Sequence, residues 1–439
     1  MEKSTPAPHV AMLATPGMGH LIPLAELAKR LAARHAMTTT LLTFASIASA
    51  TQRAFLASLP PSISVTLPLV DLFDLPPDAL IETRMSVECT RSLPTLTAIL
   101  AELTPRPAAF VTARRAGVER RCLFFPGSLH SLTLFLHLPE LSADMSGEFV
   151  TSPSRCVSRG TSSPSYAVMV HLVEHYLEAD AFLVNSFNAV EPEAAAALRH
   201  PKPGRPPVYP IGPLTVTAAI NKPGNANKPP RDPCLEWLDR QPARSVIFVS
   251  FGSGGALPEE EMSELTLGLE LSGQRFLWVV RSPSTEGSVS ANYYDAESKN
   301  DPLAYLPEGF VERTKGLGSW CQVLAHEGTG GFLTHCGWNS TLESLVHGVP
   351  MVAWPLYAEQ RLNAVMLTKG VGAAIRLPET KEKETIATVV RKVMVGEGKG
   401  ARVRAKVAEL QKAVEEGLRE GGAATATLDG VVENWVGGN

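Results

Sequence analysis

Short apolar runs alternate with amphipathic stretches along most of the chain. At the start, residues 10–14 read as a buried strand, residues 15–20 as a Gly-rich loop, and residues 21–34 as a helix with apolar side chains at helical spacing. The same alternation recurs later, and it predicts an α/β architecture with parallel sheets. Further strands are expected at 38–44, 64–67, 181–187 and 208–214.

A second series of strands and helices follows a polar stretch. Residues 215–231 are rich in Asn, Pro, Lys and Ala, which is typical of an exposed linker. We therefore predict two domains, residues 1–214 and residues 232–439. The second domain is expected to contain a strand and loop at 245–255, a helix at 259–273, a strand at 275–282 and late helices at 382–395, 401–416 and 427–436.

The stretch 320–360 is the most informative part of the chain. Residues 330–335 form a short apolar run that predicts a buried strand, and residues 336–338 predict a tight turn. A helix is expected to begin near Asn339 and to end near Gly348. A helix that starts directly after a strand presents backbone N–H groups and the positive end of its dipole, so this point predicts a phosphate site.

Polar side chains at the same point strengthen the prediction of a phosphate site. His335, Asn339 and Ser340 add side-chain donors next to the expected helix start. Ser340 and Glu343 also match the spacing of a capping box, in which the two side chains satisfy the first N–H groups of the helix. The pattern therefore has a structural interpretation beside the ligand-binding one.

Composition and charge exclude several classes of protein. The chain has 439 residues, of which 44% are hydrophobic and 19% charged, as in ordinary globular proteins. A formal net charge of −4 gives no reason to expect nucleic acid or an anionic membrane as a partner. Six scattered cysteines show no metal-ligand spacing, and no apolar run is long enough for a signal peptide core or a membrane span. We expect a cytoplasmic protein with reduced thiols, and a monomer by default.

The segments HCGWNSTLES and GVPMVAWPLYAEQ, within 335–360, closely resemble the signature box of plant family 1 UDP-glycosyltransferases. Similarity extends over about nine tenths of the chain, and it is strongest to the hydroquinone or phenol glucosyltransferase subgroup. The resemblance implies a GT-B fold, in which two Rossmann-like parallel-sheet domains face a central cleft and the last helix crosses back to the first domain. It also implies UDP-glucose as the donor substrate, a small phenolic acceptor, inversion at the sugar, and no metal or cofactor.

The resemblance assigns a role to each matching residue. His335 matches the β-phosphate contact, and Glu359 with Gln360 matches the pair that holds the sugar hydroxyls, where a terminal Gln accompanies glucose. Trp320 matches the tryptophan that stacks on uracil, although a core indole is the alternative. The remaining matches are Gln322, Gly337, Trp338, Asn339 and Ser340 around the nucleotide, Ser253 at the diphosphate, Glu343 at the ribose, and Ala358 on the acceptor side.

His20 is the candidate general base. It follows the first strand in the segment PGMGH, where the resembling family places its base. An imidazole titrates near neutral pH and can take a proton from an acceptor O–H group. The structural alternative is a histidine near a helix start with no partner. A dinucleotide site suggested by Gly17 and Gly19 lacks the third glycine and the acidic residue that such a site needs.

Three segments depart from the family pattern. The family orients its base with an Asp, but residues 112–121 contain none. Residues 151–163 replace a longer segment, and the region before Trp320 is short. An altered reading frame and genuine divergence both explain these losses. Two hypotheses follow, an active glucosyltransferase and a catalytically impaired relative that at most binds UDP-sugar. Residues 128–141 are apolar enough to line an acceptor pocket, or they form an ordinary core helix.

Overall fold

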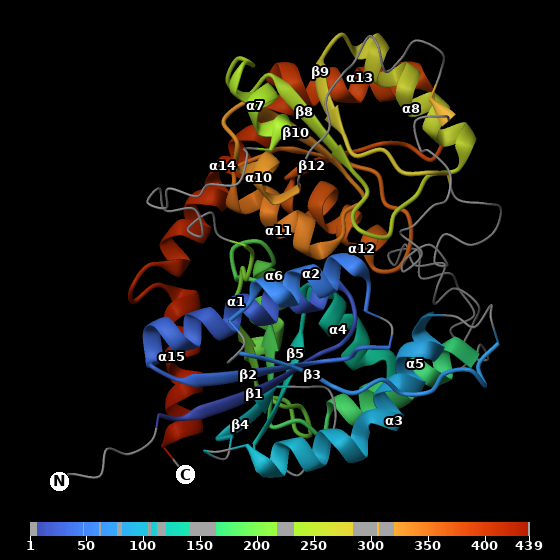
Figure 1. Ribbon diagram of the computed structural model, residues 1–439. Helices are drawn as coiled ribbons and strands as arrows, with labels where there is room; N and C mark the ends of the chain where they lie inside the picture. Colours follow the sequence, from blue (N-terminus) through green and yellow to red (C-terminus); the bar gives the residue numbers. More distant parts are fainter. Residues whose placement is uncertain are drawn as a thin grey trace, which may run out of the picture. The chain divides into compact units, whose positions relative to one another are not determined.

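The computed structural model describes most of the chain, which divides into two compact units drawn in Figure 1. Unit 1 holds the described residues up to 140, those of 164–215 and those from 416 onward, and unit 2 holds those of 216–415. The residues described are 7–46, 48–60, 63–76, 81–103, 105, 107–111, 120–140, 164–216, 232–283, 305–306 and 320–437.

Unit 1 is built on a parallel sheet of seven strands in the order β3-β2-β1-β4-β5-β6-β7. The strand order reverses between β1 and β4, which is the kind of position where open α/β sheets bind ligands. The strands are β1 (His9–Ala14), β2 (Thr38–Thr43), β3 (Ser64–Thr66), β4 (Ala109–Val111), β5 (Arg121–Phe125), β6 (Ala181–Val184) and β7 (Val208–Pro210).

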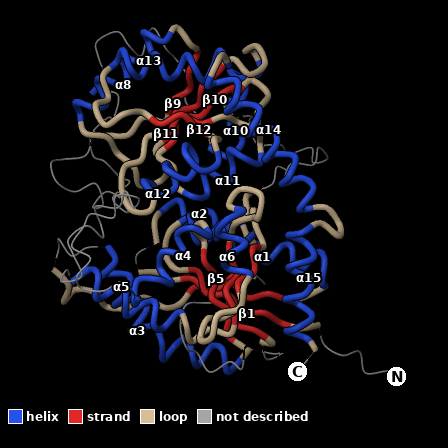
Figure 2. Tube along the Cα trace, turned by 180° about the vertical axis from the view of Figure 1, so that it is seen from behind, coloured by secondary structure: helices blue, strands red, loops and turns tan. Residues whose placement is uncertain are grey.

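Helices cover both faces of this sheet (Figure 2). One core cluster joins the strands to α1 and α15, and its members from α15 include Leu428, Val431 and Trp435. The last helix of the chain therefore belongs to the core of unit 1. The helices are α1 (Met18–His35), α2 (Ala50–Ser58), α3 (Ile81–Glu102), α4 (Leu129–His137) with a 3-10 turn at Leu138–Glu140, α5 (Pro164–Tyr176), α6 (Pro192–Arg199) and α15 (Ala423–Val436).

Unit 2 contains a parallel sheet of five strands in the order β12-β11-β10-β8-β9. The strands are β8 (Val246–Ser250), β9 (Arg275–Trp278), β10 (Thr329–Thr334), β11 (Met351–Ala353) and β12 (Ala374–Arg376). Every residue of β8, β10 and β11 is buried, as expected for parallel strands covered on both faces. The parallel α/β architecture predicted from the alternation of elements is thus confirmed in both units.

The helices of unit 2 connect these strands. They are α7 (Pro233–Asp239), α8 (Glu259–Ser272), α10 (Trp320–Ala325), α11 (Trp338–Val346), α12 (Gln360–Val365) followed by a π-helix at Met366–Val371, and α13 (Lys383–Arg391) followed by a π-helix at Lys392–Gly396. The long helix α14 (Lys399–Leu418) precedes α15. Within the part of the chain that is described, no helix has both the length and the hydropathy to cross a bilayer.

One predicted helix start is wrong, and the error concerns the candidate site. The first helix begins at Met18 rather than Leu21, because Gly17 adopts φ 112 and acts as the N-cap. The helix after β10 begins at Trp338, one residue from the predicted start near Asn339, with Gly337 as the N-cap. Residues 112–119, 151–163, 217–231 and 311–319, on which the predicted departures and most of the linker fall, lie outside the described residues.

Candidate functional site

The turn after β10 is fixed by hydrogen bonds to its backbone. Cys336 has a left-handed φ of 65°, which non-glycine residues rarely adopt. Its N–H donates to Thr334 Oγ1 at 3.2 Å, and its carbonyl accepts from Nδ2 of the fully buried Asn363 at 3.0 Å. These contacts turn the chain sharply from the strand into α11, as the sequence predicted for 336–338.

The start of α11 is a concentration of N–H donors. No side chain caps it, and its first turn contains no acidic residue. Helix starts of this kind carry a partial positive charge and attract phosphate. Trp338, Asn339 and Ser340 occupy the first turn next to the N-cap Gly337, so these four predicted contacts lie together.

The capping-box interpretation is wrong. Because the helix begins at Trp338, Ser340 is the third helical residue and cannot be the N-cap that the capping box requires. For the same reason Glu343 lies in the second turn and not in the first. Glu343 is still part of α11, one turn beyond the residues at the helix start.

His335 packs tightly between two glycines. Only 8% of the residue is exposed. A Cβ atom at Gly252 would come within 2.6 Å of His335 Nε2, and a Cβ atom at Gly337 within 2.4 Å. Burial lowers the pKa of His335 to about 4, so the ring is neutral at pH 7. Its Nδ1 is buried and has no hydrogen-bond partner among the described residues, which is a feature of an incomplete site.

The loop after β8 lies beside this histidine because β8 pairs with β10, with Ser250 opposite Thr334. Gly252 has φ +78, and Ser253 is exposed. Arg281, three residues beyond β9, donates from Nη1 to the carbonyl of Ser253. Burial lowers the pKa of this guanidinium, and the nearby Tyr357 opposes that effect. Sequence reasoning missed Arg281, although a basic residue near the end of the strand expected at 275–282 was a usable signal.

Gln360 is both a predicted sugar contact and a structural residue. It is buried, and its Oε1 accepts from the N–H groups of Leu356 at 3.0 Å and Tyr357 at 3.1 Å. Its side-chain orientation is thereby fixed, while Nε2 still carries two N–H donors. Glu359 is the N-cap residue of α12, and burial raises the pKa of its carboxyl group. Ala358, just before it, has an unusual left-handed φ of 49°.

The backbone of Trp320 and Gln322 belongs to α10. Their side chains lie outside the described part of the structure, so their predicted contacts with uracil stay predictions. α10 is the element directly before β10, the strand that leads to His335.

His20 lies in the first turn of α1, directly after β1 in unit 1. Its backbone N–H donates to Gly17 O at 3.1 Å, and the residue is half-buried. Burial lowers the pKa of its imidazole to about 4. Among the described residues no carboxylate is hydrogen-bonded to the His20 ring. The preceding loop is held by a weak contact, since Gly17 N donates to Gln52 Oε1 at 3.4 Å.

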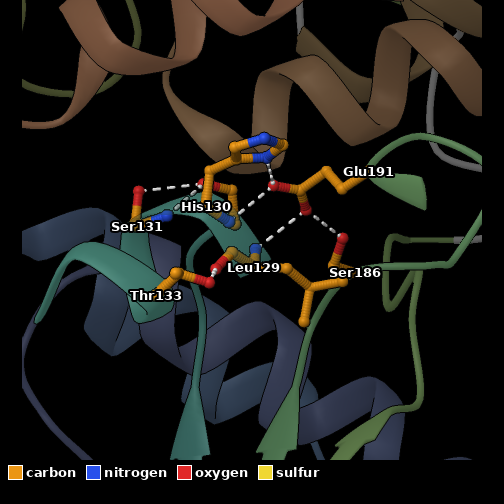
Figure 3. Close-up of polar contacts among 7 residues, drawn as sticks. Leu129, His130, Ser131, Thr133, Ser186 and Glu191 are labelled. Carbon is orange, nitrogen blue, oxygen red and sulfur yellow. Dashed lines mark hydrogen bonds and ion pairs between the residues drawn. The ribbon is translucent and has the colours of Figure 1, made fainter. Parts of the chain in front are cut away.

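A second polar cluster lies at the carboxyl ends of β5 and β6 (Figure 3). It joins the start of α4 to Glu191, the N-cap residue of α6, and to Ser186. The apolar residues of α4 face inward, because Leu129, Leu132 and Leu136 are buried in one core cluster. The core-helix interpretation of 128–141 therefore holds for these leucines, while the polar residues of the helix start lie at the sheet edge.

Comparison with known proteins agrees with this geometry. The family described as UDP-glucoronosyl and UDP-glucosyl transferase matches residues 208–402. UDP-glycosyltransferase 72B1 of Arabidopsis thaliana is 44% identical over 99% of this chain and 97% of its own length. The hydroquinone glucosyltransferase of Rauvolfia serpentina is 42% identical, and the alignment covers 98% of each protein.

A solved structure extends the likeness to three dimensions. It is a UDP-glucosyltransferase from Polygonum tinctorium, capable of glucosylating indoxyl, in complex with 3,4-dichloroaniline. It superposes with a TM-score of 0.85 at 42% identity, covering 98% of this chain and 99% of that one. The chain therefore belongs to plant family 1 of the UDP-glycosyltransferases, near the phenol glucosyltransferases, and has the GT-B fold with two Rossmann-like domains.

Proposed function

We propose that this protein transfers glucose from UDP-glucose to a hydroxyl group of a small phenol, with inversion and without a metal ion or cofactor. The observation that carries the proposal is the His335 turn, where a buried, unpartnered imidazole nitrogen lies next to an uncapped helix start. The helix start supplies the positive field that a departing diphosphate needs, and the neutral imidazole of His335 can donate one hydrogen bond to it. The names of the relatives support the phenol as acceptor.

Each predicted residue on the donor side has a part in binding UDP-glucose. N–H groups at the start of α11, together with His335 and the loop at Ser253, bind the diphosphate. Gln360, whose orientation is fixed by two backbone N–H groups, donates from Nε2 to a sugar hydroxyl. Glu359 accepts from a neighbouring hydroxyl. Trp320 and Gln322 bind the uracil, Glu343 binds the ribose, and Ala358 borders the acceptor.

The reaction is a single displacement. The acceptor oxygen attacks the anomeric carbon as its proton passes to the imidazole of His20. The bond from that carbon to the β-phosphate oxygen breaks, and UDP departs with the electron pair. His20 is neutral at pH 7, as a general base must be, and its lowered pKa makes it a weaker base than a free imidazole. Attack opposite to the leaving group inverts the configuration.

A catalytically impaired relative is the second candidate. It is favoured by one observation, that no carboxylate among the described residues is hydrogen-bonded to His20. In a comparable Ser-His-Asp triad, losing the Asp function costs about 10⁴ in rate. A phenol, with a pKa of about 10, is easier to deprotonate than an alcohol and depends less on a strong base. We therefore favour retained activity on phenols, by a monomeric protein in the cytosol.

The deciding experiment combines product formation with UDP binding. Purified protein is given UDP-glucose and a panel of phenols, with His20→Ala as the test variant and His137→Gln as the control. His137 is an exposed histidine of the same unit. We expect a β-glucoside that forms equally in EDTA, disappears with His20→Ala and persists with His137→Gln.

The other outcomes separate the two candidates. A folded protein that binds UDP in calorimetry but forms no glucoside supports the impaired relative. A folded protein that binds no UDP also contradicts the active transferase and is compatible only with the impaired relative. Product with an α-configured glucoside would contradict inversion, and product lost in EDTA but restored by a divalent cation would contradict metal independence.

A further inference from the structure

Glu191 is a buried carboxylate to which the proposed reaction assigns no task. It is fully buried, and its two oxygens accept four hydrogen bonds (Figure 3). The N–H groups of Leu129 and His130 donate at 2.8 Å each, Ser186 Oγ donates at 2.5 Å, and His130 Nδ1 lies 2.8 Å away. These hydrogen bonds offset the cost of burying the carboxylate.

The contact with His130 differs from the other three. The N–H groups of Leu129 and His130 and the hydroxyl of Ser186 donate their hydrogen atoms to Glu191, so they have none left for a ligand. The His130 ring has a second nitrogen, and its side chain is 36% exposed. When Nδ1 carries the proton that is shared with Glu191, Nε2 is a hydrogen-bond acceptor. The hydrogen bond to Glu191 raises the pKa of His130. Nε2 is an acceptor when the ring is neutral and a donor when it is protonated, and a hydroxyl group can pair with it in either form.

The position of His130 relates it to His20. His130 is the second residue of α4, after β5, and His20 is the third residue of α1, after β1. In the sheet, β4 alone separates β1 from β5. The strands that precede the two histidines therefore lie about 10 Å apart, and α1 and α4 pack on opposite faces of the sheet. Both histidines therefore lie beyond the carboxyl ends of strands in one parallel sheet, where such sheets bind ligands.

We propose that His130, oriented by Glu191, is an acceptor subsite that binds a second hydroxyl group, at the far end of the acceptor from the hydroxyl that receives glucose. The preferred acceptors are elongated aromatic diols. The distal O–H donates to His130 Nε2 while the proximal hydroxyl lies at His20. This inference rests on the proposed function. His130 is then a specificity residue, and Glu191 is a positioning residue that acts through it.

Two matched acceptors test the proposal. 4,4′-Dihydroxybiphenyl has hydroxyls at both ends, and 4-hydroxy-4′-methoxybiphenyl replaces the distal donor with a methyl ether. Wild-type protein should prefer the diol by about tenfold in kcat/KM, because a site built to bind a hydroxyl rejects an analogue without one. The two equivalent hydroxyls of the diol account for only about twofold. Hydroquinone and 4-methoxyphenol form the length control, since they are too short to reach, and should differ little.

Variants test whether the preference for the diol depends on His130. His130→Leu should reduce the preference for the diol over the ether to about twofold, because the distal hydroxyl loses its partner. Glu191→Gln should reduce it partly, because a neutral amide orients the ring with less effect on its basicity. His137→Leu, on the same helix but outside the cluster, should keep the full preference. An unchanged ratio with His130→Leu overturns the proposal, and so does an equal preference for diol and ether in the wild type.

Calorimetry keeps the test independent of turnover. If the wild type forms no glucoside, the proposed function fails, while binding of the two biphenyls to wild type and His130→Leu still decides the role of His130. Tighter binding of the diol that is lost with His130→Leu supports the subsite. If wild type and His130→Leu bind the diol equally tightly, the subsite proposal is rejected.

Discussion

The two units present their candidate residues in different ways. In unit 2 the side chain of His335 is enclosed by Gly252 and Gly337, and the turn that carries it is tied to Asn363. In unit 1 His20 lies half-buried at the start of a helix, and a 3.4 Å contact holds the preceding loop. The donor side is determined by close packing, whereas the acceptor side depends on individually placed polar groups. The donor side should therefore tolerate change poorly, and the acceptor side should tolerate it well.

Gly252 should be the most sensitive position in this comparison. Gly252→Ala introduces a Cβ atom 2.6 Å from His335 Nε2 at a residue with φ +78. Backbone strain and overpacking together should cost about 3 kcal/mol of unfolding free energy, and UDP binding should be lost. Urea unfolding and calorimetry measure both effects.

Gly372→Ala is the matched control for Gly252→Ala. Gly372 has a similar φ of +80, but no atom lies within 4 Å of its added Cβ. It should lose about 1 kcal/mol from backbone strain alone and bind UDP normally. Equal losses for the two variants would show that packing against His335 contributes nothing.

Acidification should destabilise the protein through His335. Its pKa of about 4 in the folded state lies below the unfolded value of 6.5, so the unfolded chain binds more protons between these values. Stability is therefore fully present above pH 6.5 and falls as the pH decreases toward 4. At pH 5 the loss due to this residue should be about 2 kcal/mol. His335→Asn should unfold with a smaller difference between pH 7 and pH 5 than the wild type, and an identical difference would contradict the assignment.

Arg281 should have a moderate and selective effect on the donor side. Arg281→Ala removes the donor that holds the Ser253 carbonyl, so the loop should weaken its contact with the diphosphate. We expect about tenfold weaker binding of UDP, the value of one hydrogen bond to a charged group, and unchanged binding of uridine.

Arg404→Ala is the matched control, because Arg404 is also half-buried and donates to the backbone carbonyl of Val393 at 3.1 Å. It should leave both ligands unaffected. Equal weakening of UDP and uridine by Arg281→Ala would indicate general destabilisation and not an effect on the diphosphate loop.

The smallest effect is expected at Gln52, on the acceptor side. Its Oε1 accepts the weak bond from Gly17, and its Nε2 is buried without a partner among the described residues. Gln52→Leu should change the unfolding free energy by less than about 1 kcal/mol, because replacing a poorly satisfied amide with an apolar group of similar size is nearly neutral. Thermal unfolding and phenol turnover measure this, and a large loss of either would show that the loop before His20 is as tightly built as the His335 turn.

The sequence alone determined the order of elements and the position of the donor turn. Strand and helix periodicity are local properties, so the strands that end before His20 and before His335 could be read from the pattern of apolar residues. The sequence also showed glycines near each turn, but it did not show how they would set the start of the following helix. Gly17 starts a helix three residues earlier than predicted, because its positive φ allows a helix to begin directly after the turn.

Tertiary structure decided which residues act on one another. Gly252 contacts His335 only because β8 pairs with β10, and Arg281 reaches Ser253 only because β9 lies next to β8. Glu191 reads in the sequence as an ordinary residue before a helix, yet pairing of β5 with β6 brings it to His130, 61 positions away. Strand order is not encoded by any local period, so contacts across such distances follow from the packing of the whole sheet.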